Sequence, residues 1–479
     1  MTGSNYEKDF LYSLMAPSKG SLCPFSYLMT SSFEKNNFDS FRQEVFLGRV
    51  HTAYEMLLRM FEDSEDKESF LIEASIPAHE KRHFVDLTAT TFGLYLFKHN
   101  WALCVSFFLL LQSLSKEGIK VSLPLREWCK SKNCPEEVKS FVHIYEYTEK
   151  RLSKEIGIGK PESMPKEYVP QQYDMILTKL EADNVTLPSV GFLGVDEYNI
   201  YPINGLVILE GIATIVQYNY ISKINKELAD KWWEKLSNNP QLWMYWSVPN
   251  ILTKMVGLSN EQSLIVLEWA LMIPADFTNN SPELDPAWRL YYIANYLARS
   301  KKSNQNIKKS IEEFLKLQKW RTTAEVVTLT DNYITNCFSE MKIDANDPLS
   351  TVMHEYMLSF KRSLTVRKDN PLVGFDYLEK FDSLPPMTRT ISPDGVVSIK
   401  MKKTDSEIDE IKNQGWLSYL IISRSIYDSI SKKHISCPFS LEKKHSNFPH
   451  SNECNCNLDL KNCTVSQVMQ LTGVQFNQF

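Results

Sequence analysis

The sequence has no excess of positive charge, and this absence excludes several classes of partner. Its 479 residues contain 53 Lys and Arg against 58 Asp and Glu, which gives a formal net charge of −5 at pH 7. Proteins that bind nucleic acid usually carry a basic patch or stripe, and a basic face also holds peripheral proteins on anionic membranes. We therefore expect neither nucleic acid nor a membrane among the partners of this chain.

Two features that direct chains to membranes are also missing. The first twenty residues have no basic start followed by an apolar run, so they do not resemble a secretory signal. The longest apolar run covers residues 101–111. It is shorter than the about 20 residues of a membrane-spanning helix, and we interpret it as a buried helix. Nine cysteines without a signal peptide are typical of reduced thiols in the cytosol. The sequence therefore predicts a cytoplasmic protein.

Most apolar residues of the sequence are spaced as they are on one face of an α-helix. Apolar residues recur every three or four positions in residues 46–61, in the segment that begins at Asn204, and in later segments up to residue 364. A last helix is predicted at 407–431, and no internal repeat is visible. We predict a mainly α (α+β) fold, a large helical protein with a small sheet next to the helix described below.

Residues 79–83 read His-Glu-Lys-Arg-His, which is the pattern H-E-x-x-H. Residues four apart lie on one face of a helix, so His79 and His83 can hold one metal ion between them. Glu80 follows about 100° round the helix and can reach a water molecule on that metal. At this composition the pattern arises by chance in roughly one such chain in a hundred, so its context has to decide.

The context of the motif favours a buried helix. Residues 70–76 are apolar enough for a short strand, and Pro77 then suits the first turn of a helix. In the helix that follows, apolar residues lie on all sides, which predicts that the helix is buried. Its polar side chains therefore need hydrogen-bond partners. Asp86 lies within about 20° of the His79 direction and is a candidate for orienting a ligand imidazole. The alternative is a core helix whose two histidines bond to backbone carbonyls.

A catalytic zinc ion takes three protein ligands and leaves one position for water, so the two histidines need a third partner. In zincins with a third histidine that residue would be Ala89 here, which excludes this class. Residues 209–213 read Leu-Glu-Gly-Ile-Ala on the helix after Asn204. Glu210 lies beside its apolar stripe, where an unpaired carboxylate would be costly to bury. Gly211 would let another backbone or a ligand approach closely.

The motif at 79–83 and the Glu-Gly-Ile-Ala sequence at 210–213 together resemble the gluzincin type of HExxH metallopeptidase. The continuation into Thr-Thr-Phe-Gly at 90–93 is similar to a loose group of uncharacterised bacterial metallopeptidases. In that group a helix with a Glu follows much later. The match covers about 40 residues, and the interval from the motif to Glu210 is longer than in the best-known gluzincins.

The resemblance implies a site and a reaction. One Zn²⁺ ion would be held by His79, His83 and Glu210, with His99 as a fallback third ligand. Glu80 would act as the general base in the hydrolysis of a peptide or protein substrate. An oxyanion donor is also needed, and the sequence does not choose among the tyrosines near the third-ligand segment, Tyr201, Tyr218 and Tyr220. The alternative function is a non-catalytic interaction or regulatory protein that retains a zincin-like metal site, although a scaffold would have no use for Glu80.

The residue pattern together with the resemblance predicts three parts of the chain. Residues 1–300 would form a zincin-like metallopeptidase core with the HExxH helix and the Glu-bearing second helix. Residues 301–433 would be a helical C-terminal region, and 434–479 a Cys/His-rich tail. This tail is a candidate for a second, structural zinc ion or a partly ordered segment with free thiols, and it carries Cys437, His445, His450, Cys454, Cys456 and Cys463.

Two further patterns carry other chemistry. Di-iron helical bundles also use Glu-x-x-His, but they need a second such pair, and the other instance, Glu442-x-x-His445, lies in the polar tail. Cys129 and Cys134 have four residues between them and no second pair nearby, and we interpret them as free thiols. Neither pattern competes with the HExxH motif as the centre of the chemistry.

Overall fold

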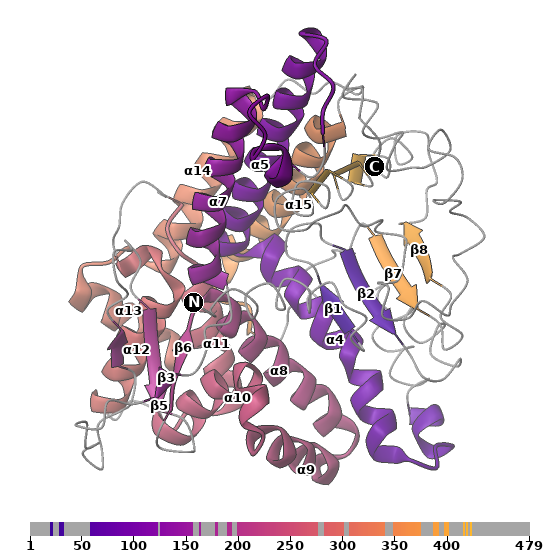
Figure 1. Cartoon of the computed structure of the whole chain (residues 1–479). Coiled ribbons are helices and arrows are strands. Elements are labelled where there is room, and N and C mark those ends of the chain that lie inside the picture. The colour runs from indigo at the N-terminus through magenta and orange to yellow at the C-terminus, as the bar shows by residue number, and fades with distance from the viewer. Residues whose placement is uncertain are drawn as a thin grey trace.

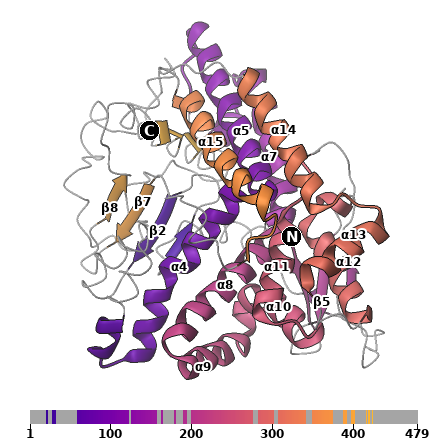
Figure 2. The ribbon, with the colours of Figure 1, turned by 180° about the vertical axis from the view of Figure 1, so that it is seen from behind.

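The structure is a computed structural model, and its helices and strands are drawn in colour in Figure 1 and from behind in Figure 2. The residues that it describes are 20–22, 28–32, 58–122, 125–156, 162–163, 178–180, 189–193, 199–275, 282–300, 306–340, 348–374, 387–391, 397–401, 415–416, 418–419 and 422–423. Most of these residues are helical, which confirms the prediction of a mainly α protein.

The longer helices of the described part are α4 (Lys67–Ala89), α5 (Thr91–Lys116), α7 (Glu136–Ile156), α8 (Gly205–Ile224), α9 (Lys226–Ser237), α11 (Asn260–Leu271), α12 (Pro286–Ser300), α13 (Ile307–Gln318), α14 (Thr323–Glu340) and α15 (Pro348–Asp369). The shorter ones are α6 (Leu125–Trp128), α10 (Trp243–Asn250), a π-helical turn η3 (Ile251–Met255) and the 3₁₀ turns η2 (Pro240–Leu242) and η4 (Pro282–Leu284). In Figures 1 and 2, α4 and α8 lie side by side.

Short strands pair at the margins of the helical part in two groups of four. The first group has the order β1 (Gly20–Leu22), β2 (Leu28–Ser32), β7 (Met387–Ile391), β8 (Val397–Met401). The second has the order β3 (Glu162–Ser163), β6 (Asn199–Ile203), β5 (Ser189–Leu193), β4 (Thr178–Leu180). The pairs are antiparallel except for β2 with β7, which run parallel.

The strand predicted at residues 70–76 is wrong, and a small sheet built on it is not found. These residues belong to α4, which begins ten residues before Pro77 at Lys67. Asp66 caps this helix, because its side chain accepts a hydrogen bond from the backbone N–H of Ser69 at 3.0 Å. The apolar run that alternated as a strand instead buries Leu71 and Ala74, which are three positions apart on one helical face.

A sharp corner separates α4 from α5, and the Thr-Thr-Phe-Gly sequence forms it. Thr90 ends α4 and caps α5: its hydroxyl donates to Asp86 O at 2.5 Å and accepts from Gly93 N at 3.2 Å. A Cβ atom on Gly93 would lie 2.3 Å from the backbone oxygen of Leu87, a distance that real side chains do not reach. The corner therefore requires glycine at position 93, which explains this part of the motif by packing.

The helix α5 is longer than the apolar run that predicted it. By length and composition it is the one helix in the described residues that could cross a membrane, a test that core helices of soluble proteins also pass. One face of α5 is buried within this protein, including Leu94, Phe97 and Leu111. The cytoplasmic location stays a prediction.

One hydrophobic core runs through the described helices. Its buried residues extend along the chain from Phe84 on α4 to Ile422, and they include members of α5, α8, α11 and α15. This cluster crosses residue 300, where the sequence predicted the end of the metallopeptidase core. The helices on both sides of that position contribute to the packing that supports α4 and α8, and the division at 300 stays a prediction.

Candidate metal centre

The candidate metal centre lies between α4 and α8, which run antiparallel. Near the start of α4, Gln217 Nε2 of α8 donates a hydrogen bond to Ser75 Oγ at 2.9 Å. One turn further along α4, His79 Nε2 lies 3.1 Å from Glu210 Oε2. Glu210 is nearly two turns before Gln217 on α8, so the two helices run in opposite directions. The N-terminus of α8 forms as predicted, because Asn204 accepts hydrogen bonds from Leu206 N and Val207 N, each at 3.1 Å. The cap determines where α8 begins, and the Ser75–Gln217 bond joins the two helices.

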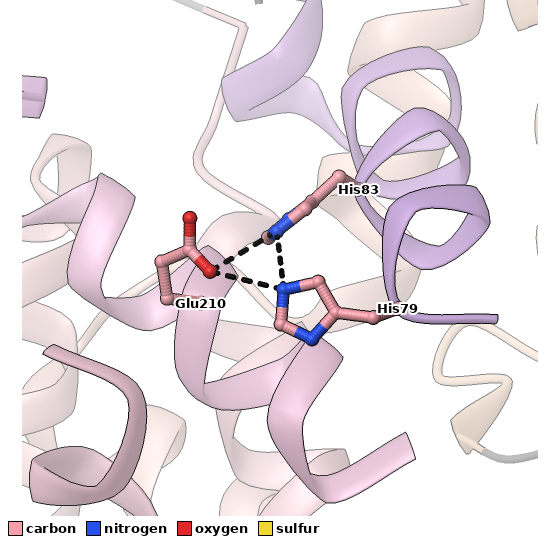
Figure 3. Close-up of side chains that lie close together, drawn as sticks. All are labelled: His79, His83 and Glu210. Atoms are coloured by element: carbon pink, nitrogen blue, oxygen red, sulfur yellow. Dashed lines mark hydrogen bonds and ion pairs between the residues drawn. The ribbon is translucent and has the colours of Figure 1, made fainter. Parts of the chain in front are cut away.

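Three side chains from these helices converge on one point (Figure 3). Glu210 Oε2 lies 3.1 Å from His79 Nε2 and 3.2 Å from His83 Nε2, and the two Nε2 atoms are 3.1 Å apart. All three residues are between 6% and 8% exposed. In the described residues this is the one group of three or more His, Cys, Asp or Glu side chains that could hold a metal ion.

The spacing and chemistry of these three atoms fit a zinc ion. Two ligand atoms that bind tetrahedral zinc at 2.0–2.1 Å lie about 3.3 Å apart, close to the three distances seen here. Two imidazoles and one carboxylate are also a known catalytic zinc ligand set. The alternative of two core histidines bonded to backbone carbonyls does not describe these rings, because both Nε2 atoms face Glu210. His79 Nδ1 is buried without a hydrogen-bond partner in the described part of the chain.

The charges at the site are strongly perturbed. Burial raises the pKa of the Glu210 carboxyl, but the attraction and hydrogen bonds of the His83 and His79 rings outweigh it and hold the pKa well below its usual range. Glu210 is therefore an anion facing two imidazoles. Burial likewise raises the pKa of Glu80, here to about 8, against a lowering by His79 and with a further increase from Glu210.

Glu80 is the general base that the motif predicts, and this role stays a prediction. It is buried at the next α4 position after His79, with 6% of its surface exposed. Its Oε2 atom has no hydrogen-bond partner among the described residues. A buried carboxylate oxygen without a partner is costly for folding, so it is a mark of a functional group rather than of a structural one.

The structure adds Tyr245 of α10, which the sequence analysis missed. Its ring centroid lies 6.1 Å from that of His79. The negative charge of Glu210, then burial, then Glu80 raise the pKa of its hydroxyl, which therefore stays protonated. Gly211 permits this approach of α10 to α8, because a Cβ atom there would lie 3.1 Å from Pro249 Cδ. That agrees with the expectation that another chain segment passes close to Gly211.

The other candidates whose side chains the structure describes are not brought to this point. Tyr218 lies toward the other end of α8, where its hydroxyl donates to Asp230 Oδ1 at 2.6 Å. Tyr220 is ten positions beyond Glu210, or about 15 Å along the helix. The side chain of Tyr201 lies outside the described residues. His99 is on α5 and packs its ring 5.3 Å from that of Tyr95.

Asp86 does not take the role predicted for it. The sequence analysis expected it to orient a histidine, but both its carboxylate oxygens contact Arg82: Nε lies 3.0 Å from each and Nη2 2.9 Å from Oδ1. The prediction failed because helical angles place Asp86 near His79 in projection but not in contact with its ring. Arg82, for which the sequence suggested no role, is its partner.

The cysteine pair that the structure describes, Cys129 and Cys134, does not belong to this site. Cys129 and Cys134 are free thiols near α6 and the start of α7. The proposed second zinc site between Cys437 and Cys463 lies outside the described residues, as does Glu442-x-x-His445.

Comparisons with known proteins do not assign this chain to a family. A scan against protein-family models finds no match for the chain, and searches of curated proteins and of solved structures find none either. The function is therefore inferred from the three side chains of the centre, from Glu80 and Tyr245, and from the chemistry that they allow.

Proposed function

We propose that the protein is a zinc-dependent metallopeptidase, a hydrolase that cleaves peptide bonds in a peptide or protein substrate. The observation that carries the proposal is the triangle of His79 Nε2, His83 Nε2 and Glu210 Oε2, with sides of 3.1 to 3.2 Å. Glu80 adds the general base that hydrolysis requires, on the same turn of α4. The cytoplasmic location and the absence of nucleic acid and membrane partners belong to the same proposal.

Each residue of the centre has a stated task in this reaction. His79, His83 and Glu210 hold the ion. A bound Zn²⁺ would supply a Lewis acid that acidifies water and polarises the scissile carbonyl, and its positive charge would favour the ionised form of Glu80. Glu80 accepts a proton from the attacking water at its carboxylate and returns it to the nitrogen of the leaving amine.

Tyr245 is suited to stabilise the charge that develops on the substrate. The oxygen of the scissile carbonyl becomes negative as water attacks, and a positioned donor lowers the energy of that state. The Tyr245 hydroxyl stays protonated because the charge of Glu210 and burial raise its pKa. It can therefore donate a hydrogen bond at every pH at which the other groups are active.

Replacing Tyr245 with phenylalanine should lower kcat by about 10²- to 10³-fold, the usual effect of losing one oxyanion donor. The zinc content should not change, because the ring does not contribute a ligand. Tyr218→Phe is the matched control, since it removes a hydroxyl from the opposite end of α8 and should leave kcat unchanged. Steady-state kinetics together with metal analysis measure both effects; equal kcat for the two variants would remove Tyr245 from the mechanism.

Metal removal tests the proposal as a whole. Purified protein should carry about one zinc ion per chain at this site, measured by atomic emission, and it should cleave unfolded casein or a defined mixture of synthetic peptides. Dialysis against a chelator should abolish cleavage, and added zinc should restore it. Wild-type protein without zinc above background, or His79→Ala with as much zinc as wild type, would contradict the metal site. Zinc without any cleavage would favour a non-catalytic protein that retains the site.

A further inference from the structure

The two middle positions of the HExxH motif carry cationic side chains, and Arg82 is deeply buried. Its side chain is 1% exposed, and that of its partner Asp86 is 0% exposed. Removing two charges from water is costly, so a buried ion pair contributes little net stability compared with apolar residues of the same shape. The presence of such a pair on the helix with the metal ligands therefore needs an explanation other than stability.

Arg82 also begins a closed circuit of hydrogen bonds that returns to the same helix. Its Nη1 donates to Gly374 O at 3.0 Å, and Gly374 N donates to Glu268 Oε2 at 2.7 Å. The other oxygen of Glu268 accepts from Arg367 Nη1 at 2.8 Å. Arg367 Nε then donates to Ala89 O at 2.7 Å. The circuit thus leaves α4 at residue 82 and rejoins it at residue 89, after contacts with α11 and α15.

The segment 371–374 closes this circuit with its backbone. Arg367 Nη1 donates to Pro371 O at 2.8 Å, four residues beyond its own position. Gly374 has a φ of +69°, a conformation that other residues rarely adopt, and it uses both its N–H and its C=O in the circuit. The backbone of residue 374 is therefore a fixed bridge between the buried charges of α4 and those of α11 and α15.

The circuit connects the two helices that supply the metal ligands. Glu268 belongs to α11, which packs against α8, and α8 carries Glu210. Together with the Ser75–Gln217 bond at the other end, the circuit holds α4 on both sides of His79 and His83. A rotation of α4 by 10° would move an atom about 7 Å from its axis by about 1.2 Å. Zinc–ligand distances tolerate only about 0.2 Å, so a small rotation would spoil the site.

We propose that Arg82 is a positioning residue for the metal centre, acting through Asp86 and Gly374 to fix the rotation of α4 relative to Glu210. The proposal rests on the proposed function, because it assumes that the three side chains bind zinc. A positioning role differs from a purely structural one in its effect on metal binding. Loss of the circuit lowers the affinity for zinc even where the fold is kept.

The test is the double variant Arg82→Met/Asp86→Leu, measured by zinc competition against a chromophoric chelator and by thermal unfolding of the zinc-free protein. Removing both members of the ion pair together keeps the volume and avoids a lone buried Asp86 or Arg82, so unfolding should occur near the wild-type temperature. The affinity for zinc should fall about 10- to 100-fold, as it does when groups that orient ligands are lost. Lys226→Met/Asp230→Leu is the control, since that pair has the same spacing on the surface of α9, and it should not change the affinity.

The possible results separate this inference from the proposed function. Wild-type protein that binds no zinc removes the proposed function and the inference with it. A folded double variant with wild-type zinc affinity removes the inference alone. If the double variant does not fold, Arg82→Lys replaces it, because lysine keeps the charge but cannot contact Asp86 and Gly374 with the same fork. Wild-type zinc affinity in Arg82→Lys would likewise overturn the positioning role.

Discussion

Glu80→Gln should leave zinc bound and reduce kcat/KM for peptide cleavage by about 10²- to 10⁴-fold, the contribution of a positioned general base. Glutamine has the shape of glutamate but cannot accept the proton from water or deliver it to the leaving amine. The substitution also replaces a buried carboxylate, whose Oε2 has no hydrogen-bond partner in the described residues, by a neutral amide. The variant should therefore unfold at a temperature no lower than that of wild type.

Kinetics and metal analysis on the same preparation check this prediction. Asp230→Asn on α9 is a matched change of carboxylate to amide away from the centre, and it should keep full activity. Equal cleavage by wild type and Glu80→Gln, at equal zinc content, would show that Glu80 is not the base. The mechanism proposed for the site would then be wrong even if the metal is present.

The second large effect concerns the third ligand. Glu210→Gln should weaken zinc binding by about 10²- to 10³-fold, if the 10–16 kcal/mol of zinc binding in small proteins is shared roughly equally among four ligands. The neutral amide is a poor zinc ligand and cannot balance the charge of the ion. His79 and His83 would remain, with their Nε2 atoms 3.1 Å apart, and two ligands alone hold zinc weakly.

Competition with a chelator of known affinity measures this loss, with Glu234→Gln on the surface of α9 as the matched control. Glu210→Gln with the zinc affinity of wild type would exclude Glu210 as a ligand. His99 would then be a poor replacement, since it lies on α5 beyond the Thr90 corner. Cleavage should fall together with zinc occupancy and return in part when excess zinc is supplied.

Much of the centre could be predicted because its signals are local. The spacing of His79 and His83 places them on one face of any helix, and Asn204 followed by an apolar stripe predicts where α8 begins. Glu210 was found because a carboxylate beside a buried stripe needs a partner. The prediction that the fold is mainly helical follows from the same periodicity. None of these steps required knowledge of which helices pack together.

The residues that the sequence did not reveal act through tertiary packing. Tyr245 reaches His79 because Gly211 lets α10 approach α8, and no local pattern around Tyr245 shows this. Arg82 meets a backbone oxygen 292 positions away, at Gly374. The strand expected at residues 70–76 was wrong because a short apolar segment fits either structure, and the cap at Asp66 decides for a helix. Long-range contacts therefore determined the outcomes for Tyr245 and Arg82, and a local cap determined the outcome for residues 70–76.

If zinc binds as we propose, the separation of its ligands along the chain would have a second consequence. His83 and Glu210 are 127 positions apart, so the unfolded chain keeps them far from each other and binds zinc weakly. An ion that binds the folded chain alone favours folding by about 4 kcal/mol when free zinc exceeds the dissociation constant a thousandfold. Cells that limit zinc would then hold more of the protein unfolded and exposed to proteases. The amount of protein, and not its activity alone, would follow the supply of the metal.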